Sequence, residues 1–237
     1  LAVIVMNNTG GARTAMGGNS ATAAIPAIMV SQTNGNLFQT TISGGTTING
    51  TIVAANDLTA TDSDFDNMII AHEYGHGIST RLTGGADNSD CLINAEQMGE
   101  GWSDWFGLML TIEPGDQAAD RRGVGTYVSN QPTTGDGIRP APYSTDFAIN
   151  NFTYSATNNT ASISEPHGIG FVWATMLWDL NWALIDQYGF DPDVKYGTGG
   201  NNIAMSLVIE GLKLQPCGPG FVDGRDAILA ADELLYA

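Results

Sequence analysis

The sequence predicts an α+β chain in which a β-rich segment, residues 1–55, precedes a mainly helical domain, residues 56–237. The first observation is a change of composition, because residues 1–54 contain no Asp or Glu and consist of short apolar runs separated by Gly-rich turns. The second is the helical periodicity of the apolar residues that follow. The third is a pair of histidines four positions apart, a spacing that places both side chains on one helix face.

Four runs in the first segment are rich in apolar and β-branched residues and are bounded by Gly and Asn, which is typical of strands. These runs are LAVIVMNN, AIPAIMVS, NLFQTTI and TINGTIVA. In the second part, residues 115–165 are rich in Gly, Pro, Asn and Thr. They are expected to form a long irregular loop region on the surface. Helices are expected over residues 68–80, 95–112, 167–189, 201–214 and 221–235.

The charge balance excludes some classes of partner. The chain has 25 acidic and 8 basic residues and a formal net charge of −17. Phosphate backbones and anionic lipid surfaces would repel such a chain, so we expect neither nucleic acid nor a membrane as a partner. We find no apolar run of the roughly 18–20 residues that span a bilayer and no visible signal peptide. The composition, with only two cysteines, indicates an exported protein.

The stretch AHEYGHGIST contains the motif H-E-x-x-H, formed by His72, Glu73 and His76. On a helix, His72 and His76 present two imidazoles to one point, as a tetrahedral zinc site requires. Glu73 comes near the same point without taking a ligand position, which suits a general base acting on water activated by zinc. The motif therefore predicts a hydrolytic zinc site.

A catalytic zinc ion needs a third protein ligand and an open fourth position. The stretch NAEQMGEGWSD places Glu100 and Asp104 four residues apart on one face of the next predicted helix. Glu100 is the expected third ligand, and Glu96, one turn earlier, is the alternative. Asp104 is then expected to accept a hydrogen bond from a zinc-bound histidine and to set the tautomer of that histidine.

Four long stretches together resemble the fungalysin family of secreted zinc metallopeptidases, which is related to thermolysin. The resemblance implies the helical half of a thermolysin-like zincin catalytic domain, and a secreted endopeptidase, made as a zymogen, that cleaves proteins. It also implies a gluzincin site with His72, His76 and Glu100 on zinc, Glu73 as base and Asp104 behind the ligands. The stretches are IIAHEYGHGISTRLTGG, CLINAEQMGEGWSDWFG, HGIGFVWATMLWDLNWALID and GLKLQPCGPGFVDGRDAILAAD.

The same resemblance gives roles to two further residues. His167, at the start of the Trp-rich helix, matches the histidine that donates a hydrogen bond to the oxyanion of the tetrahedral intermediate. Arg139, in GDGIRPAPYSTDF, resembles the arginine that binds a substrate carbonyl. Tyr143 lies nearby without a clear counterpart. The residue that orients His167 and the second oxyanion donor stay open.

Residues 1–55 resemble the second half of a protease-associated domain, which some bacterial relatives insert before the zinc helix. Family catalytic domains also have a β-rich half ahead of that helix, whereas 71 residues precede His72 here. We therefore expect a missing or separately bound N-terminal segment of the same precursor. Two alternatives stay open: a zinc-binding scaffold without turnover, and a module that delivers substrate through residues 1–54.

Two further features concern stability. Cys91 and Cys217 are expected to form a disulfide, because they are the only cysteines of a chain that we expect to be exported. Bound calcium is also expected, since acids alternate in TDSDFDN and gather again after the second predicted helix, although neither cluster is an EF-hand. The acids concerned are Asp62, Asp64, Asp66, Glu113, Asp116 and Asp120.

Overall fold

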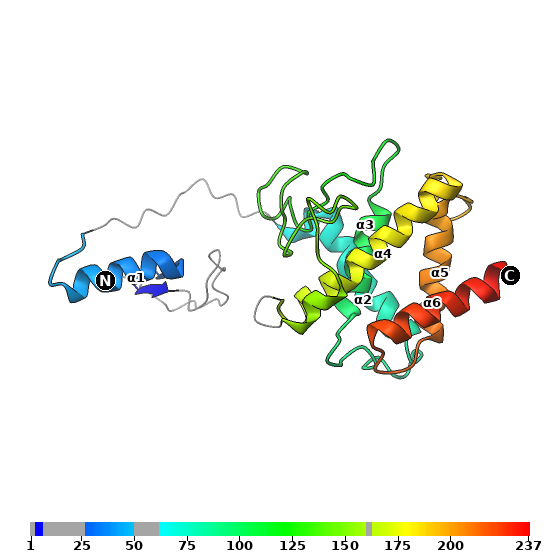
Figure 1. Ribbon diagram of the computed structural model, residues 1–237, viewed down its shortest axis with the longest axis horizontal. Coiled ribbons are helices and arrows are strands. Elements are labelled where there is room, and N and C mark those ends of the chain that lie inside the picture. Colours follow the sequence, from blue (N-terminus) through cyan, green and yellow to red (C-terminus); the bar gives the residue numbers. More distant parts are fainter. Residues whose placement is uncertain (1–2, 7–26, 50–61, 160–162) are drawn as a thin grey trace. The chain divides into compact units, whose positions relative to one another are not determined.

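The computed structural model describes residues 3–6, 27–49, 62–159 and 163–237 (Figure 1). The chain divides into two units, Leu1–Thr59 and Ala60–Ala237.

In the first unit, the strand β1 (Val3–Met6) pairs in parallel with β2 (Ala27–Val30), and helix α1 (Gln32–Ser43) follows. The strand predicted over residues 36–42 is therefore wrong. The Ser31 side chain caps the segment by accepting a hydrogen bond from the Asn34 amide, and such a cap favours helix in spite of the β-branched residues.

The four strands predicted for this segment do not combine into a β-rich domain in its described part. Two of them correspond to β1 and β2, and one is α1. Most of the fourth, residues 47–54, lies outside the described residues. The parallel pair and the helix do not show a protease-associated domain.

The second unit is helical, as predicted. Each long helix begins and ends within four residues of its expected bounds. Helix α3 packs between α2 and α4, and α5 packs between α4 and α6. Two short 3₁₀ helices, η1 (Ser63–Phe65) and η2 (Tyr154–Asn158), complete the described elements. The long helices are α2 (Asn67–Leu82), α3 (Gly99–Leu110), α4 (His167–Tyr188), α5 (Gly200–Leu214) and α6 (Phe221–Tyr236).

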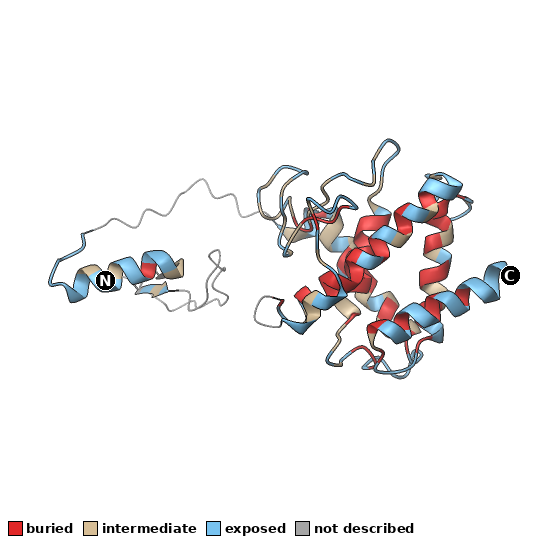
Figure 2. Ribbon diagram, in the orientation of Figure 1, coloured by how far each residue is buried: buried red, intermediate tan, exposed pale blue. Residues whose placement is uncertain are grey.

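The core of this unit lies around α3 and α4, whose ribbons are mostly buried (Figure 2). Its largest fully buried side chains are those of Trp102, Trp105, Trp173 and Trp178. By length and composition alone, α4 could cross a membrane, although no such apolar run is expected from the sequence. The most apolar 18-residue stretch of α4 is 72% buried inside the unit. The helix therefore has the properties of a core helix.

Glycines allow the central helices to approach closely. A Cβ atom at Gly75 would lie 2.9 Å from Cα of Ser103, and one at Gly101 would lie 2.2 Å from the carbonyl oxygen of Gly170. The backbone of α3 therefore contacts both α2 and α4 at positions where only glycine fits. These two crossings bring side chains of α2 and α4 within reach of Glu100 at the start of α3.

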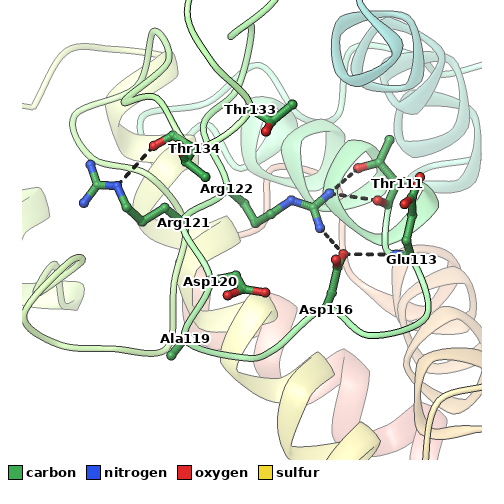
Figure 3. Close-up of a pocket in the computed structure, with 9 residues that line it drawn as sticks. All are labelled: Thr111, Glu113, Asp116, Ala119, Asp120, Arg121, Arg122, Thr133 and Thr134. Carbon is green, nitrogen blue, oxygen red and sulfur yellow. Dashed lines mark hydrogen bonds and ion pairs between the residues drawn. The ribbon is translucent and has the colours of Figure 1, made fainter.

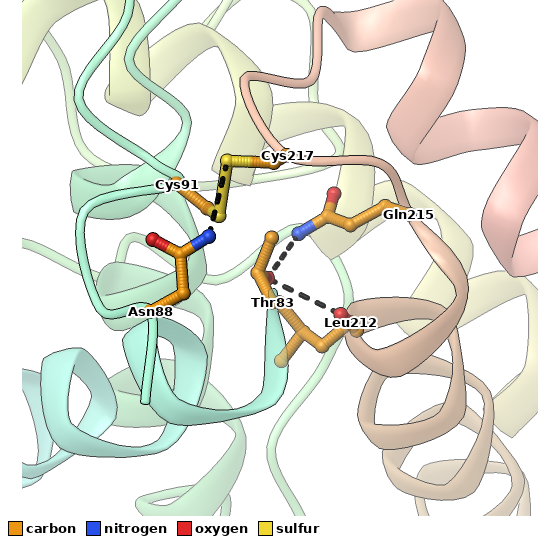
Figure 4. The surroundings of a disulfide bond; sticks show 6 residues. All are labelled: Thr83, Asn88, Cys91, Leu212, Gln215 and Cys217. Carbon is orange, nitrogen blue, oxygen red and sulfur yellow. Dashed lines mark hydrogen bonds between the residues drawn. A yellow bond between two sulfur atoms is a disulfide. The ribbon is translucent and has the colours of Figure 1, made fainter. Parts of the chain in front are cut away.

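The predicted disulfide between Cys91 and Cys217 is present, with the two Cα atoms 4.5 Å apart (Figure 4). It joins the loop before α3 to the connection between α5 and α6. Beside it, the hydroxyl of Thr83 donates to the carbonyl of Leu212 at 3.2 Å and accepts from the side-chain amide of Gln215 at 2.7 Å. The C-terminal ends of α2 and α5 are thereby tied together.

Candidate metal centre

Two histidines of α2 and a glutamate of α3 converge on one point. One ligand atom from each of His72, His76 and Glu100 lies within 4.8 Å of the others. Nε2 of His72 is 3.3 Å from Oε2 of Glu100, and Nε2 of His76 is 3.6 Å from Oε1. The three residues predicted from the sequence as ligands are therefore adjacent in space.

The chemistry and spacing of these donors fit a tetrahedral metal ion. Two imidazoles and one carboxylate form a His₂Glu set, which catalytic zinc sites use. Ligand atoms roughly 2.0–2.2 Å from one ion in tetrahedral directions stand about 3.3–3.6 Å apart. The nitrogen-to-oxygen distances of 3.3 and 3.6 Å lie in that range.

Asp104 lies behind the three donors and is fully buried. Its Oδ1 is 2.7 Å from Nδ1 of His72, which leaves Nε2 of that ring facing Glu100. The Asp104 carboxylate therefore holds the His72 imidazole in the orientation that a metal ligand needs.

Three further hydrogen bonds surround the Asp104 carboxylate. Arg139 donates from Nε to Oδ2 at 2.7 Å and from Nη2 to Oδ1 at 2.8 Å, and its Nη2 is also 3.3 Å from Oε2 of Glu100. Tyr143 donates its hydroxyl to Oδ2 at 2.5 Å. Both partners are nearly excluded from solvent, since the Arg139 side chain is 5% exposed and Tyr143 is 0% exposed.

The electrostatics of the centre favour bound cations. Burial lowers the pKa of His72, but hydrogen bonds from its ring to Asp104 and Glu100 raise it to about 9. Burial also raises the pKa of Asp104, yet the hydrogen bonds from His72 and Arg139 bring it below its usual value. The buried carboxylate of Asp104 and the partly buried one of Glu100, which favour a positive charge on an imidazole, would equally stabilise a metal cation.

Glu73 and His167 lie at the edges of this cluster. Glu73 is exposed on α2 and borders a hollow of about 810 Å³, whose lining includes Ile70, Tyr74 and Leu110. His167, the first residue of α4, has a 56% exposed side chain, and its Nε2 is 3.5 Å from Oε1 of Glu100. Both side chains are open to a bound molecule.

The alternative ligand, Glu96, lies elsewhere. Its Oε2 accepts a hydrogen bond from the amide of Phe221 at 2.5 Å, so it caps the N-terminus of α6. The structure therefore favours Glu100 over Glu96.

The first acidic cluster, predicted to bind calcium, makes helix caps. Asp62 accepts a hydrogen bond from the amide of Asp64 at 3.0 Å. Asp66 is 4% exposed, and its oxygens accept from the amides of Met68 and Val128. These carboxylates stabilise η1 and the start of α2.

The second acidic cluster borders a hollow of about 610 Å³ (Figure 3). Asp116 accepts from the amide of Glu113 at 3.0 Å and from the Arg122 guanidinium at 2.7 Å. Arg122 also donates to the carbonyl and hydroxyl of Thr111. The Arg122 guanidinium therefore already pairs with Asp116. In the described contacts, the Asp120 carboxylate accepts only from a backbone amide.

The helical unit and its His–His–Glu cluster are consistent with the helical half of a zincin metallopeptidase. The family model for fungalysin metallopeptidases (M36) matches residues 7–237. The chain belongs to the fungalysin family, which confirms the resemblance drawn from its motifs.

Several fungal proteins are similar to this chain. The extracellular metalloproteinase MEP of Neosartorya fischeri is 46% identical over 182 residues, which cover 73% of this chain and 28% of that protein. Extracellular metalloproteinase 10 of Coccidioides posadasii is 43% identical, with the same coverage. Extracellular metalloproteinase 4 of Trichophyton soudanense is 44% identical over 73% of this chain and 45% of that protein. The chain thus matches less than half the length of these relatives.

Proposed function

We propose that the chain carries the metal centre of a secreted zinc endopeptidase that hydrolyses peptide bonds in proteins. The observation that carries this proposal is the convergence of His72, His76 and Glu100 at distances that suit one tetrahedral zinc ion, in a member of a metallopeptidase family. The names of the relatives as extracellular proteinases support secretion. The disulfide between Cys91 and Cys217 is consistent with an oxidising compartment.

In this proposal His72 and His76 bind zinc through Nε2, and Glu100 binds through its carboxylate. When bound, zinc would supply a Lewis acid that polarises a peptide carbonyl and activates water for attack. Asp104 keeps the proton of His72 on Nδ1, so that Nε2 is free to act as a ligand.

Glu73 is the proposed general base. It follows His72 directly on α2, and its exposed carboxylate borders the hollow beside that helix, so it can reach both water and substrate. It would take a proton from the attacking water and later pass it to the leaving amine. This hollow is lined in part by Ile70, Tyr74 and Leu110, and its lining contains none of the three proposed zinc ligands.

His167 is the proposed oxyanion donor. Its ring, at the start of α4, lies 3.5 Å from Oε1 of Glu100, and half of its side chain is exposed. A donor there can contact the oxygen that gains charge during attack. Arg139 remains the proposed contact for a substrate carbonyl, while its observed bonds to Asp104 and Glu100 support a role in holding these two acids in place.

Hydrolysis of casein and of a quenched fluorescent peptide tests the proposal. We expect cleavage within the peptide, loss of cleavage on chelation with phenanthroline, and recovery when zinc is added back. Elemental analysis should find one zinc per chain. Stoichiometric zinc without hydrolysis would contradict the endopeptidase and favour a zinc-binding scaffold. Peptide binding that survives loss of zinc would favour the substrate-delivering module.

A further inference from the structure

We propose that Tyr143 is a positioning residue of the metal centre, which acts on His72 through the Asp104 carboxylate. The inference rests on the proposed zinc site and adds to it a residue outside the H-E-x-x-H motif and its glutamate. In the described part of the chain, the side-chain hydrogen bond of Tyr143 goes to Asp104 and not to a proposed ligand. Its hydroxyl donates to Oδ2 of Asp104, while Oδ1 of the same carboxylate faces Nδ1 of His72.

The Asp104 carboxylate has no spare acceptor position. A carboxylate offers about four lone-pair sites. Here Oδ1 contacts His72 and Arg139, and Oδ2 contacts Arg139 and Tyr143. Asp104 is fully buried, so water has no route to replace a lost donor. Removing the phenol hydroxyl would therefore leave one acceptor position unsatisfied.

Arg139 supplies only part of the hydrogen bonding of this carboxylate. Its two parallel hydrogen bonds give each oxygen one donor. Tyr143, four residues further along the same loop, adds a hydrogen bond to Oδ2. The position of Oδ1, and with it the direction of the His72 ring, then depends on both donors.

Tyr143 is itself held in place by backbone hydrogen bonds and by a ring contact. Its backbone exchanges two hydrogen bonds of 2.9 Å with Arg122. The Arg122 guanidinium in turn donates to Thr111, which follows the last residue of α3 (Figure 3). The Tyr143 ring also lies 5.1 Å from the ring of Phe171 on α4. The phenol is therefore anchored to α3, which carries Asp104, and to α4.

The variant Tyr143→Phe tests this role because it removes the hydroxyl and keeps the ring against Phe171. Its matched control is Tyr127→Phe, since Tyr127 is 50% exposed. We would measure the zinc Kd of the whole chain by competition with a chromophoric chelator at fixed pH, and confirm folding by circular dichroism. Loss of a partner behind a metal ligand typically costs 10–100-fold in affinity. We expect a Kd roughly 10-fold higher for Tyr143→Phe and an unchanged Kd for Tyr127→Phe.

A double-variant cycle separates positioning from general destabilisation. If Tyr143 acts through Asp104, then Tyr143→Phe should have almost no further effect on the zinc Kd in an Asp104→Asn background. An unchanged Kd for Tyr143→Phe, or equal effects in both backgrounds, would overturn the inference. Failure of the unaltered chain to bind zinc would instead overturn the proposed function on which the inference rests.

A measurement on the unaltered chain covers the case in which Tyr143→Phe does not fold. The hydroxyl proton of Tyr143 should be protected from exchange, and its NMR resonance should shift when zinc binds, because His72 and Tyr143 share one carboxylate. A resonance that does not respond to zinc would overturn the inference.

Discussion

Gly170, in the first turn of α4, lies directly against Glu100: a Cβ atom at position 170 would stand 2.5 Å from Cβ of Glu100. The proposed zinc ligand of α3 and the proposed oxyanion donor His167, one turn before Gly170, are therefore brought together by a contact that only glycine permits. The geometry of the metal centre thus depends on helix packing as well as on the ligands themselves.

The variant Gly170→Ala should separate α3 from α4 and displace Glu100. We expect a loss of about 1–3 kcal/mol in the free energy of unfolding, the usual cost of overpacking, together with weaker zinc binding. Denaturant titration and a zinc competition assay would measure the two effects. The control is Gly77→Ala on α2, where a Cβ atom would meet nothing within 4 Å.

The control should leave stability unchanged or raise it by about 0.5–1 kcal/mol, because alanine is the better helix former. If Gly170→Ala behaves like Gly77→Ala, the contact does not position Glu100.

Replacing both Cys91 and Cys217 with serine should lower the melting temperature. The bridge spans 126 residues of sequence, and a loop of this size is worth up to about 4–5 kcal/mol in the chain-entropy model, often less in practice. Zinc binding at room temperature should persist, because the described side-chain contacts of the two cysteines do not include a proposed ligand. Thermal unfolding of the variant, compared with the unaltered protein with and without reductant, measures the effect. Equal melting temperatures in all samples would mean that the bridge contributes nothing.

Calcium at one of the two acidic clusters remains a prediction. Arg122 already pairs with Asp116, so the carboxylates of Glu113 and Asp120 are the better candidates beside that hollow. We expect elemental analysis to find calcium, and a calcium-selective chelator that spares zinc to lower the melting temperature. An unchanged melting temperature with no calcium found would leave Arg122 as the cation that stabilises this loop.

The long helices and the three proposed ligands could be predicted because the signals are local. Apolar periodicity defines each helix, and the spacing of His72 and His76 fixes their shared face on α2. Chain order and the apolar surroundings of its helix indicate Glu100 as the third ligand. The cysteines could be paired since the chain has only two.

Features that depend on distant contacts or on competing local signals were harder to predict. Residues 36–42 contain several β-branched residues, which favours a strand. The Ser31 cap and the absence of a partner strand in the described residues favour α1 instead. Tyr143 received no role because its contact with Asp104 joins positions 39 residues apart with no recognisable motif. Likewise, only the folded chain places Glu96 at the start of α6.

The rate of peptide hydrolysis by Glu73→Gln, measured beside its zinc content, tests the central claim most directly. The substitution leaves His72, His76 and Glu100 untouched but removes the proposed base. We expect one zinc per chain and a kcat lower by about 10²–10⁴-fold, while Glu233→Gln, at an exposed position of α6, should match the unaltered protein. A Glu73→Gln protein that binds zinc and keeps more than about a tenth of the original rate would contradict the account, because a positioned base contributes far more than that.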